Sequence, residues 1–134
     1  MAYWRLYYHF VWSTKDRLAL VDCQIEARVF SAIAAKAQEL NAIVHAIGGM
    51  EEHIHLVVSI PPKVALSEFI GQVKGSSSHF VNHVLMPGYY FAWQAEYGVQ
   101  SFNEKDLPAV VNYVKHQKEH HLQGKIWEKF EQAE

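Results

Sequence analysis

Two histidines, His53 and His55, flank a single aliphatic residue in a segment whose side chains alternate in character. Because successive side chains of a strand point to opposite sides of a sheet, both imidazoles are expected on one face. Imidazole nitrogens bind borderline transition metals, whereas carboxylate and amide oxygens suit magnesium and manganese. We therefore interpret the pair as part of a divalent-metal site that still needs a third ligand. The competing interpretation is a polar pair on a solvated strand face.

Tyr113 and Gln117 lie four residues apart in a segment with helical periodicity, so they are expected to share a face. The helical projection places Leu107, Val111 and Val114 on the packing side and the tyrosine and glutamine on a separate polar face. Gln117 is then a candidate third metal ligand and Tyr113 a candidate nucleophile. A tyrosine hydroxyl has an ordinary pKa near 10, so it needs a metal or a base to attack at neutral pH. Without the histidine pair, both would be read as solvated helix residues.

Other histidine chemistries do not match the pattern. A histidine-triad hydrolase needs a third alternating histidine, and Val57 stands at that position. The His-Glu-x-x-His string of zinc peptidases is absent. Paired His-x-Ser/Thr motifs of two-histidine phosphoesterases are also absent. A cysteine nucleophile would depend on Cys23 alone, which is more typical of a packed residue.

Composition indicates one folded domain over residues 1–134, because half of the residues are apolar and only 19% are charged. A single cysteine excludes an internal disulfide. The net charge of −2 argues against a general polyanion binder but leaves room for local basic patches. No apolar run has the length of a membrane helix, and no secretory signal is evident, so we expect a cytoplasmic protein.

Periodicity predicts seven main elements. They are strands over 3–12, 42–47, 53–60 and 90–93 and helices over 22–40, 66–85 and 105–122. Asp22 is the predicted N-cap of the first helix, Gly48-Gly49 the turn between the second and third strands, and 126–130 a short terminal helix.

This order predicts an α+β fold of the ferredoxin-like or RRM-like type, a split βαβ plan with one antiparallel sheet. We expect helices on one face, an open second face and a tyrosine-bearing helix at the C-terminal end. His53 and His55 would lie on the central third strand, on the open face. Arg5, Tyr7 and His9 of the first strand would decorate the same surface.

Four motifs together resemble the small single-tyrosine transposases of bacterial and archaeal insertion sequences, members of the HUH superfamily. The motifs are YHFVWSTK at 8–15, HIHLVV at 53–58, Trp93-Gln94 with Tyr97-Gly98, and YVKHQ at 113–117. The REP-associated tyrosine transposases share them. One departure is Glu51-Glu52, where the family more often has a less acidic turn; a carboxylate there would either join the metal or repel DNA.

The resemblance implies that His53, His55 and Gln117 bind Mg²⁺ or Mn²⁺ and that Tyr113 forms a 5′-phosphotyrosine with single-stranded DNA. It also implies hairpin-bearing DNA ends as substrate, and a homodimer in which the tyrosine helix of one chain completes the site of the other. Such an enzyme would act on the nucleoid of a prokaryotic cell.

Lys74, Ser76 and Ser77 fall inside a predicted helix, where glycine and serine are poor helix formers. Their plain interpretation is a tolerated kink; the resemblance favours a basic, hydroxyl-rich patch that contacts hairpin phosphates. Lys15, Arg17 and Arg5 are weaker candidates for the same role. Two other functions remain open. One is a domesticated hairpin-binding protein that no longer mobilises DNA, and the other is a metal-dependent hydrolase for a small phosphate ester.

Overall fold

The computed structural model describes residues 4–122 and residue 131. Its strands are β1 (Tyr7–Ser13), β2 (Ile43–Met50), β3 (His53–Ser59) and β4 (Gly98–Phe102). Its α-helices are α1 (Glu26–Glu39), α2 (Leu66–Phe80), α3 (Leu107–Lys115) and α4 (Gln117–Leu122). Shorter helical segments are η1 (Lys15–Arg17), η2 (Val81–Leu85), a π-helix that continues α2, and η3 (Glu104–Asp106). In this described part, no helix is both long and apolar enough to cross a membrane.

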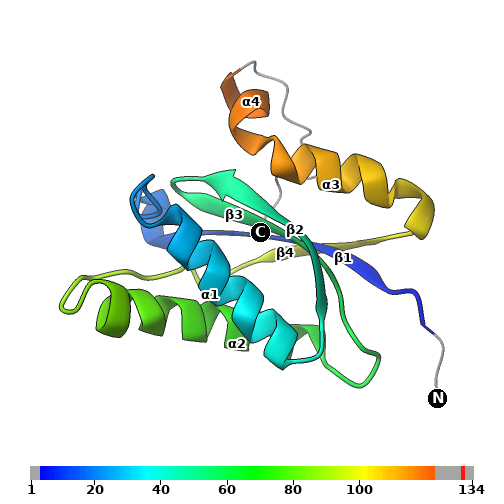
Figure 1. Ribbon diagram of the computed structural model, residues 1–134, viewed down its shortest axis with the longest axis horizontal. Coiled ribbons are helices and arrows are strands. Elements are labelled where there is room, and N and C mark those ends of the chain that lie inside the picture. The colour runs from blue at the N-terminus through cyan, green and yellow to red at the C-terminus, as the bar shows by residue number, and fades with distance from the viewer. Residues whose placement is uncertain (1–3, 123–130, 132–134) are drawn as a thin grey trace.

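The four strands form one antiparallel sheet in the order β2-β3-β1-β4. The predicted α+β fold is therefore confirmed, with α1 and α2 on one face of the sheet and α3 and α4 on the other (Figure 1). β3 lies between β2 and β1, and its register pairs His55 with Val11 and His53 with Ser13. The histidine pair therefore lies in the interior of the sheet, as the sequence predicts.

The main core lies between the sheet and the helices α1 and α2. Alternate residues of β1 and β3 point into it, because strand side chains alternate between faces. Buried members of this core are Phe10, Trp12, Ile54, Leu56, Val58, Val29, Ile33, Ala37, Phe69, Ile70 and Val73.

The second face of the sheet is covered, so the expectation of an open face is wrong. α3 packs on β2 and β3 and forms a second apolar cluster with them. Its buried members are Ala46, Val57, Val110, Tyr113 and Val114. Val57, on the histidine face of β3, is fully buried by this cover.

Three predicted elements differ from the structure. Gly48-Gly49 is part of β2 and not a turn, because β2 runs on to Met50. The segment 90–93 has no strand of its own; Trp93 makes one isolated bridge to Thr14, and the fourth strand is Gly98–Phe102. The last helix is divided at His116, whose backbone leaves helical geometry between α3 and α4.

Helix starts also differ slightly from the prediction. α1 begins at Glu26, while the Asp22 carboxylate accepts backbone N–H groups of Gln24 at 2.9 Å and Ile25 at 3.2 Å in the preceding turn. Asp22 thus makes a capping type of bond one turn early. The predicted terminal helix over 126–130 lies outside the described residues.

Candidate active site

His53 and His55 project from β3 toward α3, on the same face of the sheet as predicted. Their side chains are 3% and 0% exposed, and their ring centroids lie 5.1 Å apart. Strand alternation brings the two rings together, and the cover of α3 removes them from water. A polar pair on a solvated strand face is therefore excluded as the explanation.

α3 and the start of α4 bring Tyr113 and Gln117 to these histidines. The ring of Tyr113 lies edge-on to that of His55, with centroids 5.9 Å apart. The Oε1 atom of Gln117 lies 3.4 Å from Nε2 of His53. The prediction of a shared face is confirmed, but the prediction that this face is polar and exposed is wrong. Both side chains are 1% exposed, because the face that packs on the sheet is the one that carries Val110, Tyr113 and Val114.

Glu131 completes the cluster and is the residue that sequence reasoning missed. Its Oε1 atom lies 3.0 Å from Nε2 of His55 and 3.4 Å from Nε2 of His53. Its Oε2 atom accepts a hydrogen bond from the hydroxyl of Tyr113. Burial alone would raise the pKa of Glu131, but its bonds to His55 and Tyr113 and the nearby His53 lower that pKa to about 2. The carboxylate is therefore ionised.

The donor atoms of this cluster suit a divalent metal. Ligand atoms of His53, His55 and Glu131 all lie within 4.8 Å of one another, so this group can hold a metal ion. The amide oxygen of Gln117 adds a neutral donor beside them. Two imidazole nitrogens with two oxygens are a mixed donor set of the kind that holds divalent cations.

The other ring nitrogens of the histidines are also bonded. Nδ1 of His53 lies 2.8 Å from Oε1 of Glu52, and Nδ1 of His55 lies 2.8 Å from Nε2 of His9. Glu52 thus neither joins the ligand cluster nor stands free; it is the partner of a ligand, and Arg17 lies 3.7 Å from it. Burial lowers the pKa of His9 to about 3, and burial also lowers that of His55, so both rings are uncharged.

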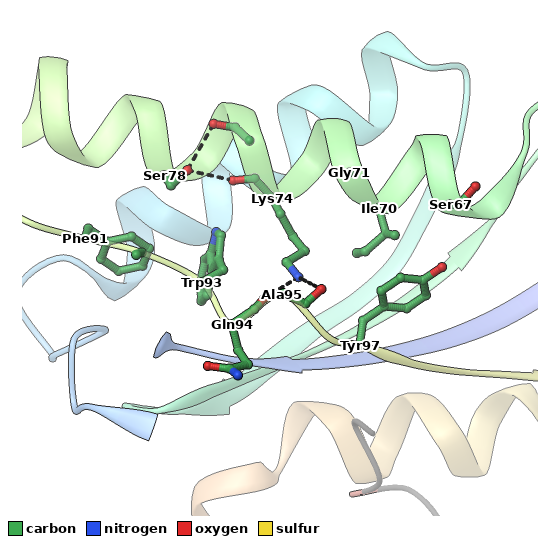
Figure 2. A pocket seen from close by; sticks show the side chains of 12 residues that line it. Ser67, Ile70, Gly71, Lys74, Ser78, Phe91, Trp93, Gln94, Ala95 and Tyr97 are labelled. Carbon is green, nitrogen blue, oxygen red and sulfur yellow. Dashed lines mark hydrogen bonds between the residues drawn. The ribbon is translucent and has the colours of Figure 1, made fainter. Parts of the chain in front are cut away.

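Lys74 lies on the opposite face, at a pocket of about 520 Å³ between α2 and the segment 91–97 (Figure 2). The ammonium group of Lys74 donates to the carbonyl oxygens of Gln94 at 2.6 Å and of Ala95 and Glu96 at 3.3 Å. Its half-buried position lowers its pKa, an effect that Glu96 opposes. Lys74 therefore links α2 to the backbone of residues 94–96, on the other side of the pocket.

Ser77 is fully buried, and its hydroxyl accepts a bond from the indole N–H of Trp93 at 2.9 Å. Ser76 is half-buried and lies 3.4 Å from the carbonyl oxygen of Val73. α2 runs without a break through the glycine and serine residues where a kink was predicted. The hydroxyls of Ser77 and Ser78 bond to carbonyl oxygens one turn earlier. Of the three α2 candidates, only Lys74 lines the pocket.

Lys15 and Arg17 are exposed on η1, next to the same pocket wall. Nζ of Lys15 lies 3.4 Å from the hydroxyl of Tyr90, and the backbone N–H of Asp16 donates to the side chain of Gln94 at 3.3 Å. Arg5 stands at the other end of β1, where it pairs with Glu104 at 3.1 Å. The structure therefore brings Lys15 and Lys74 to the segment 90–97, places Arg17 beside Glu52, and leaves Arg5 apart.

Comparison with known proteins places the chain in a family. The model of the family described as "Transposase IS200 like" matches residues 2–117. Transposases for the insertion sequence element IS200 from Salmonella typhimurium and Salmonella typhi are each 27% identical over 126 residues, which cover 90% of this chain and 82% of theirs.

Solved structures share the fold. A protein described as a transposase from Deinococcus radiodurans superposes with a TM-score of 0.66 at 19% identity, covering 92% of this chain and 93% of that one. A REP-associated tyrosine transposase bound to a REP hairpin gives a TM-score of 0.67 at 17% identity, covering 94% of this chain and 76% of that one. The family match over residues 2–117 is the deciding finding: the chain belongs to the IS200-like transposase family.

Proposed function

We propose that this chain cleaves and rejoins single-stranded DNA at hairpin-bearing element ends through a phosphotyrosine on Tyr113. The observation that supports this most is the convergence of groups on Glu131. The hydroxyl of Tyr113 meets one of its oxygens, and the Nε2 atoms of His53 and His55 face the other. A nucleophile therefore lies directly beside a set of metal donors, which is the arrangement that phosphoryl transfer to a tyrosine requires.

The covalent step follows from these positions. The hydroxyl oxygen of Tyr113 attacks the scissile phosphorus, its O–P bond forms and the bond from phosphorus to the 3′ oxygen breaks. The hydroxyl of Tyr113 donates to Oε2 of Glu131, which orients it, and its proton is lost to solvent as the oxygen attacks. The leaving 3′ oxygen takes a proton from water and becomes a 3′-OH, while the 5′-phosphate stays on Tyr113.

A bound Mg²⁺ or Mn²⁺ would polarise the scissile phosphate and stabilise the charge that develops on its oxygens. His53, His55 and Gln117 are the proposed ligands, with Glu131 as a further oxygen donor. The chain's own contribution is to bury these groups under α3, where electrostatic interactions with the phosphate are stronger than in water.

Rejoining is the same step in reverse. A 3′-OH from another strand attacks the phosphotyrosine, the new P–O bond forms and Tyr113 leaves with a proton. Because the energy of the cleaved bond stays in the covalent intermediate, no nucleotide cofactor is needed. In the alternative, a hydrolase for a small phosphate ester, water would attack the covalent intermediate. Activity on a substrate as large as a hairpin end distinguishes the transposase from that hydrolase. The proposed site of action is the nucleoid in a prokaryotic cytoplasm.

For the hairpin we propose the surface around the Figure 2 pocket. Lys15 and Lys74 place positive charge along the segment 90–97, with Arg17 on the same short helix η1 as Lys15. Phosphate contacts of this kind set affinity without reading sequence. Tyr90 is 66% exposed beside Lys15 and offers an aromatic face for a base. Arg5 is a separate contact at the far end of β1, and Ser76 and Ser77 support the surface from within α2. The similar transposase bound to a REP hairpin supports a hairpin as the partner class.

We also propose a homodimer in which the tyrosine helix completes the site of the partner. The residues reach one another within one chain here, so the same contacts serve either arrangement. Mixing Tyr113→Phe chains with His53→Ala chains separates the two. Only a site that takes its tyrosine from one chain and its histidine pair from the other can be active in the mixture, so cleavage would support the proposed dimer. An inactive mixture that still forms dimers would show that each site is built within one chain.

The test of the chemistry is a denaturing-gel assay for a protein–DNA adduct. Labelled single-stranded hairpin DNA from the flanks of the gene is incubated with Mn²⁺, Mg²⁺ or EDTA, using wild type, Tyr113→Phe and His53→Ala. We expect a metal-dependent adduct with wild type alone. Tyr113→Phe loses only a hydroxyl, so its fold and hairpin affinity should equal those of wild type.

Two results would overturn the proposal. An adduct that persists in Tyr113→Phe would move the nucleophile to another residue. Hairpin binding without any adduct, in either metal, would favour the domesticated hairpin-binding protein.

A further inference from the structure

Each of the two proposed metal-binding histidines contacts a second side chain through its Nδ1 atom. Oε1 of Glu52 lies 2.8 Å from Nδ1 of His53, and Nε2 of His9 lies 2.8 Å from Nδ1 of His55. The two Nε2 atoms are left to face Glu131, at 3.4 and 3.0 Å. Both histidines therefore turn Nδ1 to a supporting side chain and Nε2 to Glu131, although their ring planes are inclined by 73°. The supports differ in chemistry, a carboxylate on one and an imidazole on the other.

The support at Nδ1 matters because it decides which of the two ring nitrogens carries the proton. A neutral imidazole carries one proton, and the nitrogen that binds a metal must be bare. In this structure the ionised carboxylate of Glu131 can only accept, so Nε2 of His55 carries the proton and donates to it at 3.0 Å. If Nε2 instead binds the metal, that proton moves to Nδ1 and needs an acceptor. The atom in position is Nε2 of His9, which accepts only when the proton of His9 sits on its own Nδ1.

We propose that His9 is a positioning residue for His55: by accepting the Nδ1 proton it orients the ring and presents a bare Nε2 to the metal. This inference rests on the metal site of the proposed function. Partners of this kind fix the tautomer and ring orientation of metal-binding histidines. His9 of β1 is paired in register with Val57 of β3. Its ring stacks on that of His55 with centroids 5.0 Å apart, so strand pairing and stacking both hold the His9 ring beside His55.

Burial explains why a histidine serves here and a carboxylate serves at His53. His9 is 2% exposed, and a charged acceptor at that depth would lose its hydration without a cation to pair with. Glu52 is at the end of the strand pair, where its charge is partly solvated and Arg17 lies 3.7 Å away.

The test compares Mn²⁺ binding by wild type, His9→Phe and His9→Gln, measured from the free Mn²⁺ signal in electron paramagnetic resonance. Phenylalanine keeps the ring and removes the acceptor, whereas the glutamine amide can place an acceptor near the same point. We expect the dissociation constant to rise about 10- to 100-fold in His9→Phe and to stay near the wild-type value in His9→Gln. His79→Phe, a change at an exposed histidine of α2, is the control.

Three outcomes would overturn the inference. One is a folded His9→Phe protein that binds Mn²⁺ as wild type does. Another is an equal loss in His9→Gln and His9→Phe, which would make ring stacking the role of His9. In the first two cases the metal site and the proposed function survive. The third is a wild type that binds no Mn²⁺, because that result removes the metal site and with it the group that His9 is proposed to position.

A second measurement holds even if His9→Phe fails to fold. Wild type with ¹⁵N-labelled histidine is titrated with Zn²⁺, a diamagnetic ion that imidazole binds, and the ring nitrogens are assigned by nuclear magnetic resonance. We expect His55 to carry its proton on Nδ1 and His9 to carry its proton on Nδ1 as well. A His9 ring protonated on Nε2 in the Zn²⁺ form would be a donor to His55 and would overturn the inference.

Discussion

A Cβ atom placed on Gly48 would lie 1.9 Å from the backbone carbonyl oxygen of Val114. α3 thus rests directly on the backbone of β2, with no side chain between them. This contact sets the height of the tyrosine helix above the sheet, because Val114 is the neighbour of Tyr113. The distance between nucleophile and metal donors therefore depends on a glycine in another element.

Gly48→Ala should consequently displace α3 from the sheet. Backbone at this position leaves no room for a methyl group, so we expect a loss of about 1–3 kcal/mol in the free energy of unfolding and about 100-fold less adduct, since a shift near 1 Å has that effect on a reacting geometry. Denaturant unfolding and the adduct assay measure the two effects. Gly75→Ala, in α2 where nothing lies within 4 Å, should stabilise the chain slightly. Wild-type stability and cleavage in Gly48→Ala would show that α3 does not rest there.

Local patterns predicted most of the fold. The alternation of His53 to Ser59 and the spacing of Val29, Ile33 and Ala37 are signals within one element, and both elements have those buried faces. Gly48-Gly49 was misread as a turn, because a glycine that permits close approach of a helix looks in the sequence like a glycine that permits a turn. The packing of α3 on β2 is a tertiary contact, and no local sequence pattern predicts it.

The same limit applies to the candidate site. Strand and helix spacing predicted four residues of the site, and the structure brings all four together: His53, His55, Tyr113 and Gln117. His9 was placed on the correct face of β1, but its bond to His55 depends on the register of β1 with β3. Glu131 had no signal at all, because a single carboxylate that follows the last described helix has no periodicity to place it.

Acid should destabilise the chain partly through His9. The unfolded chain takes up a proton on this residue as the pH falls below about 6.5, whereas the folded chain does not until about 3. Between these values the unfolded state binds more protons, so stability falls as the pH falls, by up to about 1.4 kcal/mol per pH unit for this one group. We expect a shallower dependence in His9→Gln when the free energy of unfolding is measured from pH 7 to pH 4. An exposed change, His79→Gln, should keep the wild-type slope; equal slopes in all three proteins would contradict the neutral state of His9.

Glu131→Gln separates a metal ligand from a simple partner of the tyrosine. Glutamine keeps the shape and an oxygen that can accept from Tyr113, but it removes the negative charge between His53 and His55. We expect Mn²⁺ binding to weaken about 10-fold, as measured by titration calorimetry, with the fold retained. Glu119→Gln, an exposed change on α4, is the matched control. Unchanged Mn²⁺ affinity in Glu131→Gln would restrict this carboxylate to its contact with the tyrosine.

Lys74 and Lys15 should behave differently when their charges are removed. Lys74 donates to three carbonyl oxygens of the pocket wall, so Lys74→Met should lower the free energy of unfolding by about 2 kcal/mol. Lys15 is exposed and its ammonium group lies 3.4 Å from the hydroxyl of Tyr90, so Lys15→Met should leave stability unchanged. If Lys15 contacts a hairpin phosphate, Lys15→Met should reduce the slope of log affinity against log salt by about 1. A hairpin titration at several salt concentrations measures that slope, and a wild-type slope in Lys15→Met would remove this residue from the DNA surface.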